Sequence, residues 1–583
     1  MGGTWDRVQF SCDGRQVEVD AAPGESLLSV LRERLGITSV KDGCAPQGQC
    51  GCCTVLVDGE ARVACVTPAT RVAGKSVTTV AGLDAEVRDP IAQAFVECGG
   101  SQCGFCTPGI VVRAAGLAAK GKIARGTHGR TALDRALAAH LCRCTGWQTV
   151  YDALVPSASG ADERDLDAAA RRAELEGGAP QRVGIDVPLG HGGFADDTAP
   201  RSLDGRDDVL VAVPSPPGSA AATVPAAGVD WVVAQSLLEA RALAGKVQGR
   251  RTTVAAAPPL PVPTVPDGGV ALATSWVEPA YLEPDASWCV PGGEPADPLA
   301  NGGAFGGKAP SVAAPAARAL ADRLGVPVRT VFAREDVVRL GPKRPPVAAT
   351  ARLLDGIVTI DGIVAGDVAP FTAPIAWAYA LEERASWTSI VLAGPSTSGA
   401  LRAVGLAERA VLIEGALTAE GAERLALVHD VRAAAVLLDS CVPAQSGALA
   451  GARVRVADNG TVESVQVRVA AGDPLDEVAL TSYAIGAAHM ALGWVLTEGI
   501  AVDPDTGEVH DLTIRSFGII RAKDVPPVHV EIVDDAGAPR AGASDAVFAA
   551  VAAATWNAIS AAEGERPDTF PAAATRAAGA LRK

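Results

Sequence analysis

The alternation of apolar and polar residues predicts two strand pairs close to the N-terminus. In residues 7–20, RVQFSCDGRQVEVD, the alternation continues on both sides of an Asp-Gly pair, which is typical of a hairpin with a tight turn. Residues 54–66, TVLVDGEARVACV, repeat the pattern around a second Asp-Gly pair. Between them, three leucines of residues 23–36, PGESLLSVLRERLG, fall on one face of a helix. Hairpin, helix and hairpin together predict a small β-grasp domain over residues 1–82.

The spacing of apolar residues becomes helical over residues 83–155. Stretches such as IVVRAAGLAA and TALDRALAAHL predict helices that would pack as a four-helix bundle. The following residues, 156–190, are small, charged and glycine-containing. Such a composition indicates a connector that runs over the surface.

The composition favours a soluble protein with several domains. At 583 residues, of which 48% are hydrophobic and 20% charged, the chain is too long for one core. The formal net charge is −16 and no basic block occurs, so nucleic acid is not an expected partner. The N-terminus lacks the apolar core of a signal peptide, and the most apolar window, roughly 484–502, contains His489 and Glu498. We therefore expect a cytoplasmic protein without a membrane span.

Eight of the 13 cysteines fall into two groups of four. Because the cytosol keeps thiols reduced, we interpret them as ligands rather than disulfides. Thiolates are soft ligands, and two groups of four suit two iron–sulfur clusters. The first group is Cys44, Cys50, Cys53 and Cys65.

The loop of the first group has the spacing C-x5-C-x2-C, one residue longer than the C-x4-C-x2-C of plant-type ferredoxins. Cys52 competes with Cys53 for the third position. We assign Cys53, because CG-x-CT places it as in the plant-type loop, and we expect Cys52 to be a small packed side chain. The loop glycines should let backbone amides point at the sulfurs.

The second group consists of Cys103 and Cys106 in QCGFCTPG and of Cys142 and Cys144 in HLCRCTGW. Both pairs fall at expected helix ends, where they would meet at the centre of the bundle. Zinc also accepts four thiolates, so the spacing alone leaves a zinc site open.

Together, QCGFCTPG, CRCTG and the preceding ferredoxin-type loop closely resemble the iron–sulfur portion of the molybdenum hydroxylases, the xanthine dehydrogenase and aldehyde oxidoreductase family. The resemblance covers roughly residues 5–155, and the extra residue in the first loop is the departure from it. It implies a [2Fe–2S] cluster in each cysteine group, with the helical one nearer the pterin.

Several later segments resemble the molybdopterin-binding part of the same family, although large pieces of that part are missing. They include GFADDTAP, AYLEPDASW and GGAFGGK. The resemblance implies a shortened α+β molybdopterin-binding-type region over residues 191–583, with two subdomains at roughly 191–420 and 421–583. A flexible turn is the alternative for GGAFGGK. The resemblance instead implies a loop that approaches the cofactor through Gly302, Gly303, Phe305, Gly306 and Gly307.

Two residues of this region would act on the substrate. Asp545, in GASDAVF, stands where the family has a glutamate that serves as the general base, and it is one methylene shorter. The alternative is that Ser544 or Asp545 is an ordinary N-cap of the following helix. Arg402, in a local R-x-x-G, would orient an anionic or carbonyl substrate; its alternative is a solvated arginine at a helix end.

Two alanines narrow the range of substrates that the resemblance implies. Ala309 stands where purine-oxidising members carry a glutamate, which disfavours xanthine. Ala403 stands where carbon monoxide dehydrogenases carry a cysteine, which disfavours carbon monoxide. Aldehydes and N-heterocycles remain.

The leading hypothesis is a molybdenum hydroxylase-like oxidoreductase for such a small molecule, with water as the oxygen source. Its two [2Fe–2S] clusters would pass electrons to a separate flavoprotein or other redox partner, because we see no flavin domain. The alternative is an iron–sulfur electron-transfer subunit with a degenerate region that binds no molybdopterin. An oligomer is compatible with both.

Overall fold

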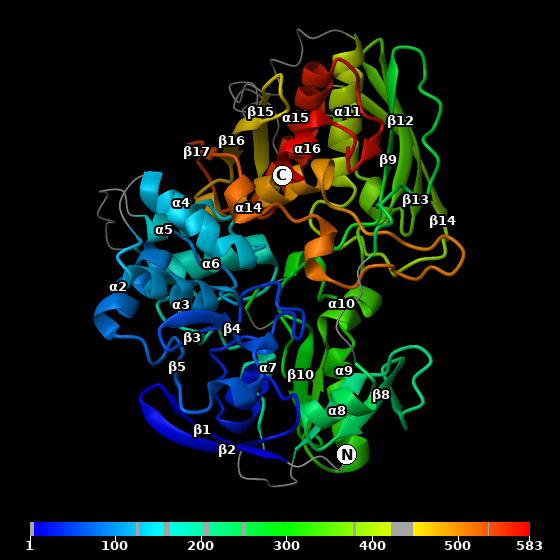
Figure 1. Ribbon diagram of the computed structural model, residues 1–583. Coiled ribbons are helices and arrows are strands. Elements are labelled where there is room, and N and C mark those ends of the chain that lie inside the picture. The colour runs from blue at the N-terminus through cyan, green and yellow to red at the C-terminus, as the bar shows by residue number, and fades with distance from the viewer. Residues whose placement is uncertain are drawn as a thin grey trace.

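Within the described residues, four β-sheets and the helices between them organise the chain (Figure 1). The computed structural model describes residues 5–123, 127–155, 164–201, 209–246, 252–299, 301–302, 304–376, 381–420, 447–534 and 536–582.

The first sheet has the strand order β2-β1-β5-β3-β4. Its strands are β1 (Asp6–Cys12), β2 (Arg15–Ala21), β3 (Thr54–Val57), β4 (Glu60–Val63) and β5 (Ser76–Thr78). Asp13 and Gly14 both have positive φ, 49° and 79°, as the tight turn of a twisted hairpin requires. Between the hairpins, α1 (Leu27–Ser29) continues into a π-helical turn (Val30–Arg34). The predicted β-grasp arrangement is confirmed.

Helices follow the sheet, as the spacing of residues 83–155 predicts. They are α2 (Ala85–Glu97), α3 (Thr107–Ala118), α4 (Thr127–Ala136) and α5 (Gln148–Leu154). α2 packs against α3 and α5, and α3 packs against β3. The bundle therefore lies directly on the first sheet (Figure 1).

The segment expected to be a surface connector contains a partly buried helix, α6 (Leu166–Gly177). α6 packs against α14 (Glu477–Leu496) of the C-terminal part. The side chains of Arg172 and Glu176 are fully buried. The expectation of a surface connector does not hold for this helix, because the charges of Arg172 and Glu176 are paired inside the protein and not solvated by water.

The second sheet has the order β10-β11-β6-β8-β7. Its strands are β6 (Leu210–Pro214), β7 (Val224–Ala226), β8 (Val229–Ala234), β10 (Ala286–Cys289) and β11 (Val328–Val331). The helices around it are α7 (Ala195–Thr198), α8 (Leu237–Leu243), α9 (Ala313–Leu324) and α10 (Arg334–Leu340). α8 covers β6 and β8, whereas α9 packs on β10 and β11.

A buried ionic network fastens the first sheet to the second. Arg32 donates to Asp196 at 2.6 Å and to Asp197 at 3.0 Å. Arg329 of β11 donates to Glu33 at 2.7 Å and to Asp196 at 2.8 Å. Because both guanidinium groups are almost completely buried, loss of one partner would leave a costly unpaired charge.

The third sheet has the order β14-β13-β12-β9-β18 and the fourth β15-β16-β17. Their strands are β9 (Gly269–Thr274), β12 (Val347–Leu354), β13 (Ile357–Ala365), β14 (Glu382–Ile390), β15 (Leu449–Val456), β16 (Val462–Ala470), β17 (Val528–Ile532) and β18 (Thr569–Phe570). The remaining helices are α11 (Leu406–Glu420), α15 (Ala543–Glu563) and α16 (Arg576–Arg582). α15 lies between α11 and α14 and forms the largest hydrophobic core with them and the two sheets. Mixed helices and sheets confirm the α+β fold expected for this region.

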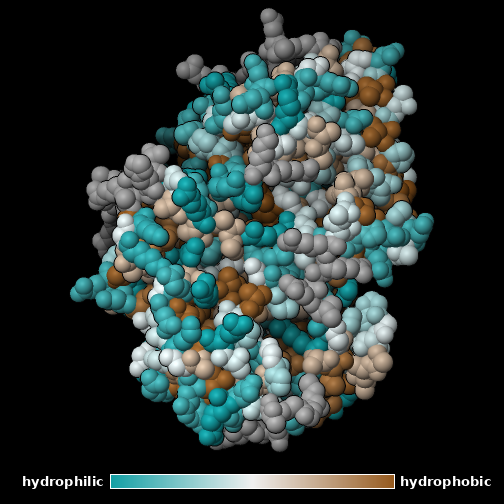
Figure 2. Space-filling model, in the orientation of Figure 1, coloured by the Kyte–Doolittle hydropathy of each residue, from teal (hydrophilic) through white to brown (hydrophobic). Residues whose placement is uncertain are grey.

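Two helices of the described chain, α14 and α15, are long and apolar enough to cross a membrane. Their most apolar windows are, however, 89% and 61% buried inside the protein, as in core helices of globular proteins. Figure 2 shows polar residues over most of one face of the molecule, with hydrophobic residues scattered among them. The position of α14 and α15 in the hydrophobic core therefore explains their length and apolar composition.

Candidate active site and iron–sulfur centres

The four cysteines of the first group are all buried; Cys44, Cys50 and Cys53 precede β3, whereas Cys65 follows β4. Backbone amides point at their sulfurs: Gln49 and Cys50 each donate to the Cys44 Sγ at 3.3 Å. Cys65 donates its amide to the Cys53 Sγ at 3.4 Å. Thiol hydrogen bonds from Cys50 and Cys65 hold the pKa of Cys44 well below its usual range. The site therefore stabilises a thiolate, the form that ligates iron.

Cys52 lies beside this group. Its side chain is buried, and its Sγ lies 3.9 Å from the carbonyl oxygen of Cys50. Cys53 is instead joined to Cys65. The choice of Cys53 as the ligand stays a prediction.

The second cysteine group forms two contacting pairs at helix ends. The sulfurs of Cys103 and Cys144 are 3.4 Å apart. Cys106, the N-cap of α3, is hydrogen-bonded to Cys142, and this bond lowers the pKa of Cys142 to about 7. The pairs meet where the helix-end pattern places them. Among the described residues no three His, Cys, Asp or Glu side chains are arranged to hold a single metal ion. Two pairs of sulfurs instead suit a two-iron cluster, with two sulfurs for each iron.

The two cysteine groups share one wall. The amide of Leu141 donates to the carbonyl oxygen of Cys50 at 2.9 Å, and each of these residues is a ligand or adjoins one. Gly51 lies so close to His140 that a Cβ on it would be 2.5 Å from the imidazole. Burial lowers the pKa of His140 to about 3, so this ring is neutral and adds no charge between the groups.

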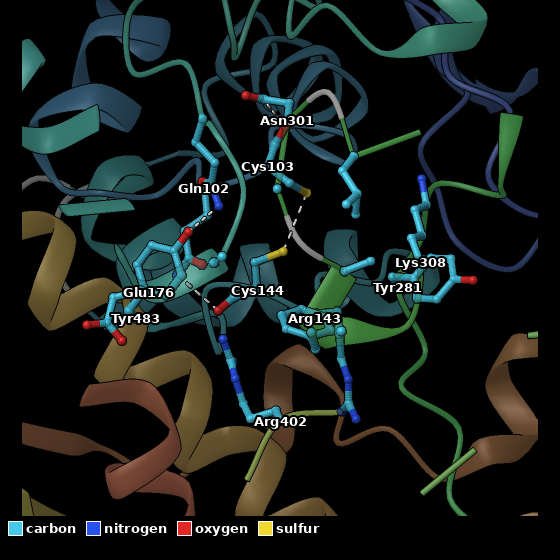
Figure 3. Close-up of a pocket in the computed structure, with 18 of the residues that line it drawn as sticks. Gln102, Cys103, Arg143, Cys144, Glu176, Tyr281, Asn301, Lys308, Arg402 and Tyr483 are labelled. Carbon is cyan, nitrogen blue, oxygen red and sulfur yellow. Dashed lines mark hydrogen bonds between the residues drawn. The ribbon is translucent and has the colours of Figure 1, made fainter. Parts of the chain in front are cut away.

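A cavity of about 460 Å³ extends from the second cysteine group to the start of α15 (Figure 3). Its volume is in the range of small-molecule sites, roughly 300–1,000 Å³. Segments far apart in the sequence line it. Among the lining residues are Cys103, Cys144, Glu176, Phe305, Arg402 and Asp545.

Side-chain amides fix the cysteine end of the cavity. Gln102 donates from Nε2 to the carbonyl oxygen of Cys144 at 3.0 Å and to Ser482 at 2.9 Å. Asn301 donates from Nδ2 to the carbonyl oxygen of Cys103 at 2.7 Å. Figure 3 shows both amides beside the Cys103–Cys144 pair. Sequence patterns did not assign a role to either residue, although Gln102 is the first residue of QCGFCTPG and Asn301 directly precedes GGAFGGK.

A buried ion pair supports the same end. Arg143, between two ligand cysteines, donates to both oxygens of Glu498 at 2.5 and 2.6 Å. Its Nε donates to the carbonyl oxygen of Pro279 at 3.1 Å. The cysteine segment is thereby joined to the end of α14.

The glycine loop runs along the cavity from the cysteine end toward Arg402. Gly302 (φ 120°) lines the cavity beside Cys103, and Gly306 (φ 82°) lines it beside Ala400. The site chiefly needs glycine at 306, because a Cβ would lie 1.9 Å from the carbonyl oxygen of Ala400. Gly307 makes room for the Tyr281 ring and is not among the lining residues. Gly303 lies outside the described residues.

Arg402 is buried and not solvated, so the helix-end alternative is wrong. Its side chain is 5% exposed, its Cζ lies 4.7 Å from the centre of the Phe305 ring, and its Nε lies 3.7 Å from an oxygen of Asp545. Its amide donates to the carbonyl oxygen of Phe305 at 3.0 Å. Phe305, Arg402 and Asp545 therefore form one contiguous end of the cavity.

Asp545 does not cap its helix. α15 begins after Gly542, and Ser544 and Asp545 lie in its first turn, so the N-cap alternative is wrong for both residues. The Asp545 side chain is 45% accessible and lines the cavity. Burial raises the pKa of Asp545 above its usual range, and the nearby Arg402 opposes the shift. The cavity thus holds a carboxyl group that binds a proton more readily than a fully solvated aspartate does.

Comparisons with known proteins match the two cysteine-bearing parts. The profile of the 2Fe-2S iron-sulfur cluster binding domain matches residues 10–76, and that of the [2Fe-2S] binding domain matches residues 79–155. The match over residues 79–155 favours a [2Fe–2S] cluster at the second cysteine group over the zinc site that the spacing alone left open.

The similar curated proteins align with the first quarter of the chain. The xanthine dehydrogenase iron-sulfur-binding subunit of Escherichia coli O157:H7 is 38% identical over 149 residues, which is 25% of this chain and 91% of that subunit. The aldehyde oxidoreductase of Megalodesulfovibrio gigas is 44% identical over 138 residues, which is 23% of this chain and 15% of that protein.

A solved structure extends the likeness of fold beyond that quarter. The aldehyde oxidoreductase from Desulfovibrio gigas matches 99% of this chain and 100% of its own, with a TM-score of 0.70 at 16% identity. Two [2Fe–2S] domains beside a ligand-sized cavity define an iron–sulfur oxidoreductase. The chain belongs to the molybdenum hydroxylase family, which includes xanthine dehydrogenase and aldehyde oxidoreductase.

Proposed function

We propose that the protein oxidises an aldehyde or an N-heterocycle and passes the electrons through its two [2Fe–2S] clusters to a separate acceptor. One observation carries this proposal: a single cavity has cysteine ligands at one end and the Arg402–Asp545 pair at the other. Reaction and electron exit can therefore take place at opposite walls of one site.

The cavity fits a molybdopterin cofactor in size and lining. The polar groups beside Cys103, namely Gln102, Asn301 and the backbone at Gly302, would hold its pterin end. Glu283 offers an oxygen, Oε1, that is buried and has no hydrogen-bond partner among the described residues. When bound, the cofactor supplies a centre that accepts two electrons from the substrate while water provides the oxygen.

Asp545 would act as the general base. A carboxyl group whose pKa is raised toward neutrality accepts a proton more readily than a fully solvated one, and burial shifts the pKa of Asp545 in this direction. Arg402 keeps the carboxylate beside the cavity and limits the shift. Asp545 is one methylene shorter than glutamate. It can reach the reacting group only if the start of α15 is held closer to that group.

Phe305 and Arg402 would select the substrate. A flat apolar ring beside a guanidinium suits an aromatic molecule that carries a carbonyl or ring nitrogen. Ala309 lines the cavity and offers no carboxylate for a purine. This supports an aldehyde or a simple N-heterocycle rather than xanthine.

The test is metal and pterin analysis of protein purified anaerobically. We expect about four iron per chain, the content of two [2Fe–2S] clusters, together with one molybdenum and a releasable pterin. Turnover of benzaldehyde or quinoline with a dye acceptor in ¹⁸O-labelled water should label the product, and Asp545→Ala should abolish turnover with cluster spectra intact. Iron without molybdenum would refute the enzyme and support the electron-transfer subunit with a degenerate region.

The remaining assignments are part of the same proposal. They are a cytoplasmic location, a flavoprotein or other redox partner as acceptor, and domains at 1–82, 83–155 and 191–583. Size-exclusion chromatography with light scattering would establish whether the protein forms an oligomer.

A further inference from the structure

Helix α15, which carries Asp545, begins without a cap from its own segment. Its N-cap, Gly542, has φ 80° and no side chain to accept a hydrogen bond. The Oγ of Ser544 is buried without a hydrogen-bond partner among the described residues. The first amides of a helix have no acceptor within the helix, so this buried start depends on an acceptor from elsewhere.

Glu176 of α6 supplies this acceptor. Its Oε2 accepts the amide of Ser544 at 2.7 Å. Arg172, one turn earlier on α6, donates from Nη2 to the other oxygen of Glu176 and, at 2.7 Å, to the carbonyl oxygen of Arg540. A carboxylate at a helix N-terminus is also favoured by the helix dipole. α6 therefore holds the start of α15 from both sides.

We propose that Glu176 is a positioning residue for Asp545: its carboxylate caps helix α15 and fixes the next side chain at the cavity wall. Glu176 itself lines the cavity (Figure 3). The importance of this arrangement for catalysis rests on the proposed role of Asp545 as the base. The capping does not depend on that role.

The charges that face Asp545 come from three segments. Arg402 precedes α11 and Arg344 precedes β12, and both lower the pKa of Asp545, as does the amide of Ala403. Glu176 is the facing anion, and it raises the pKa in addition to the larger effect of burial. Glu176 thus opposes the two arginines.

Three variants separate the cap from the charge. Glu176→Ala removes the acceptor, whereas Glu176→Gln keeps an acceptor oxygen and removes the charge. Glu174→Gln is the matched control, because Glu174 is exposed on the same helix. Hydrogen–deuterium exchange of the peptide at the start of α15 should be roughly tenfold faster in Glu176→Ala, as expected for the loss of a helix cap. It should stay close to wild type in Glu174→Gln. In Glu176→Gln it should rise less than in Glu176→Ala, because the glutamine keeps an acceptor although the buried Arg172 loses its counter-charge. Unchanged exchange in Glu176→Ala would overturn the cap.

The charge is measured without turnover. Infrared difference titration of each protein against its Asp545→Asn counterpart reports the pKa of Asp545. This pKa should be lower in Glu176→Gln than in the wild type and unchanged in Glu174→Gln, because only the first variant removes a facing anion. An equal or higher value in Glu176→Gln would overturn the electrostatic part, even if the alanine variant does not fold. If Asp545→Ala retained turnover, Asp545 would not be the base of the proposed reaction. Hydrogen exchange and the infrared titration would still decide whether Glu176 caps α15 and raises the pKa of Asp545.

Discussion

Replacing Gly306 by alanine should damage the site more than the small added methyl suggests. Gly306 has φ 82°, and a Cβ on it would lie 1.9 Å from the carbonyl oxygen of Ala400, whereas real Cβ atoms essentially never come closer than 3.0 Å. The glycine loop and the segment before α11 must therefore separate by about 1 Å. This separation would act on the Phe305–Arg402 hydrogen bond, which joins the same two segments.

The expected loss of folding stability in Gly306→Ala has two parts. A left-handed conformation costs a non-glycine residue about 1–2 kcal/mol, and overpacking of a closed contact costs about 1–3 kcal/mol. Gly292→Ala isolates the first part, because Gly292 has φ 69° and nothing within 4 Å of its added Cβ. The free energy of unfolding should therefore fall further in Gly306→Ala than in Gly292→Ala, by about 1–3 kcal/mol.

The assay compares both variants by thermal unfolding and by aldehyde turnover. Gly306→Ala should lower the unfolding midpoint more than Gly292→Ala, and it alone should lower turnover, since Arg402 moves with its segment. The electron paramagnetic resonance spectra of the clusters should be unchanged in both, which excludes an effect through the cysteine sites. If the two variants had equal unfolding midpoints and equal turnover, the close approach of Gly306 to the carbonyl oxygen of Ala400 would not be the reason for glycine at this position.

Three further predictions concern the cysteine end and its support. Cys53→Ser should halve the iron content and remove one cluster spectrum, whereas Cys52→Ser should retain both clusters; the reverse result would exchange the two assignments. Glu498→Gln should lower stability by about 3–5 kcal/mol, because the buried Arg143 would lose its counter-charge, and a midpoint equal to wild type would contradict the buried pair. Burial lowers the pKa of His489 to about 4, below its unfolded value of about 6.5. Since this folded-state pKa is depressed, the stability that His489 contributes is complete above pH 6.5 and is lost as the pH falls toward 4. His489→Gln should therefore flatten the decline of the unfolding midpoint over this interval, and an unchanged slope would show that other groups cause it.

The N-terminal quarter of the fold could be predicted because its signals are local. Two Asp-Gly turns between alternating strands fix both hairpins, and the cysteine spacing marks the loops around each group. These patterns depend on neighbours within a few residues, which the sequence displays directly.

The support of the candidate site could not be predicted because it depends on contacts between distant segments. α6 has a charged, small-residue composition typical of a connector, yet Arg172 and Glu176 find partners more than 360 residues later. For the same reason Asp545 was open to interpretation as an N-cap. The N-cap, Gly542, is only three positions before Asp545, and here a carboxylate from another helix accepts a first-turn amide.

The hydrogen bond between Leu141 and the carbonyl oxygen of Cys50 has a consequence for kinetics. Because it joins the backbones of the two cysteine groups directly, the tunnelling distance between the clusters depends on the contact of the β-grasp and helical domains and not on the C-terminal region. Opening or closing of the C-terminal region would then leave the rate of cluster-to-cluster transfer unchanged. In the proposed electron path, conformational gating of turnover would therefore act before the electrons enter the helical domain or after they leave the β-grasp domain.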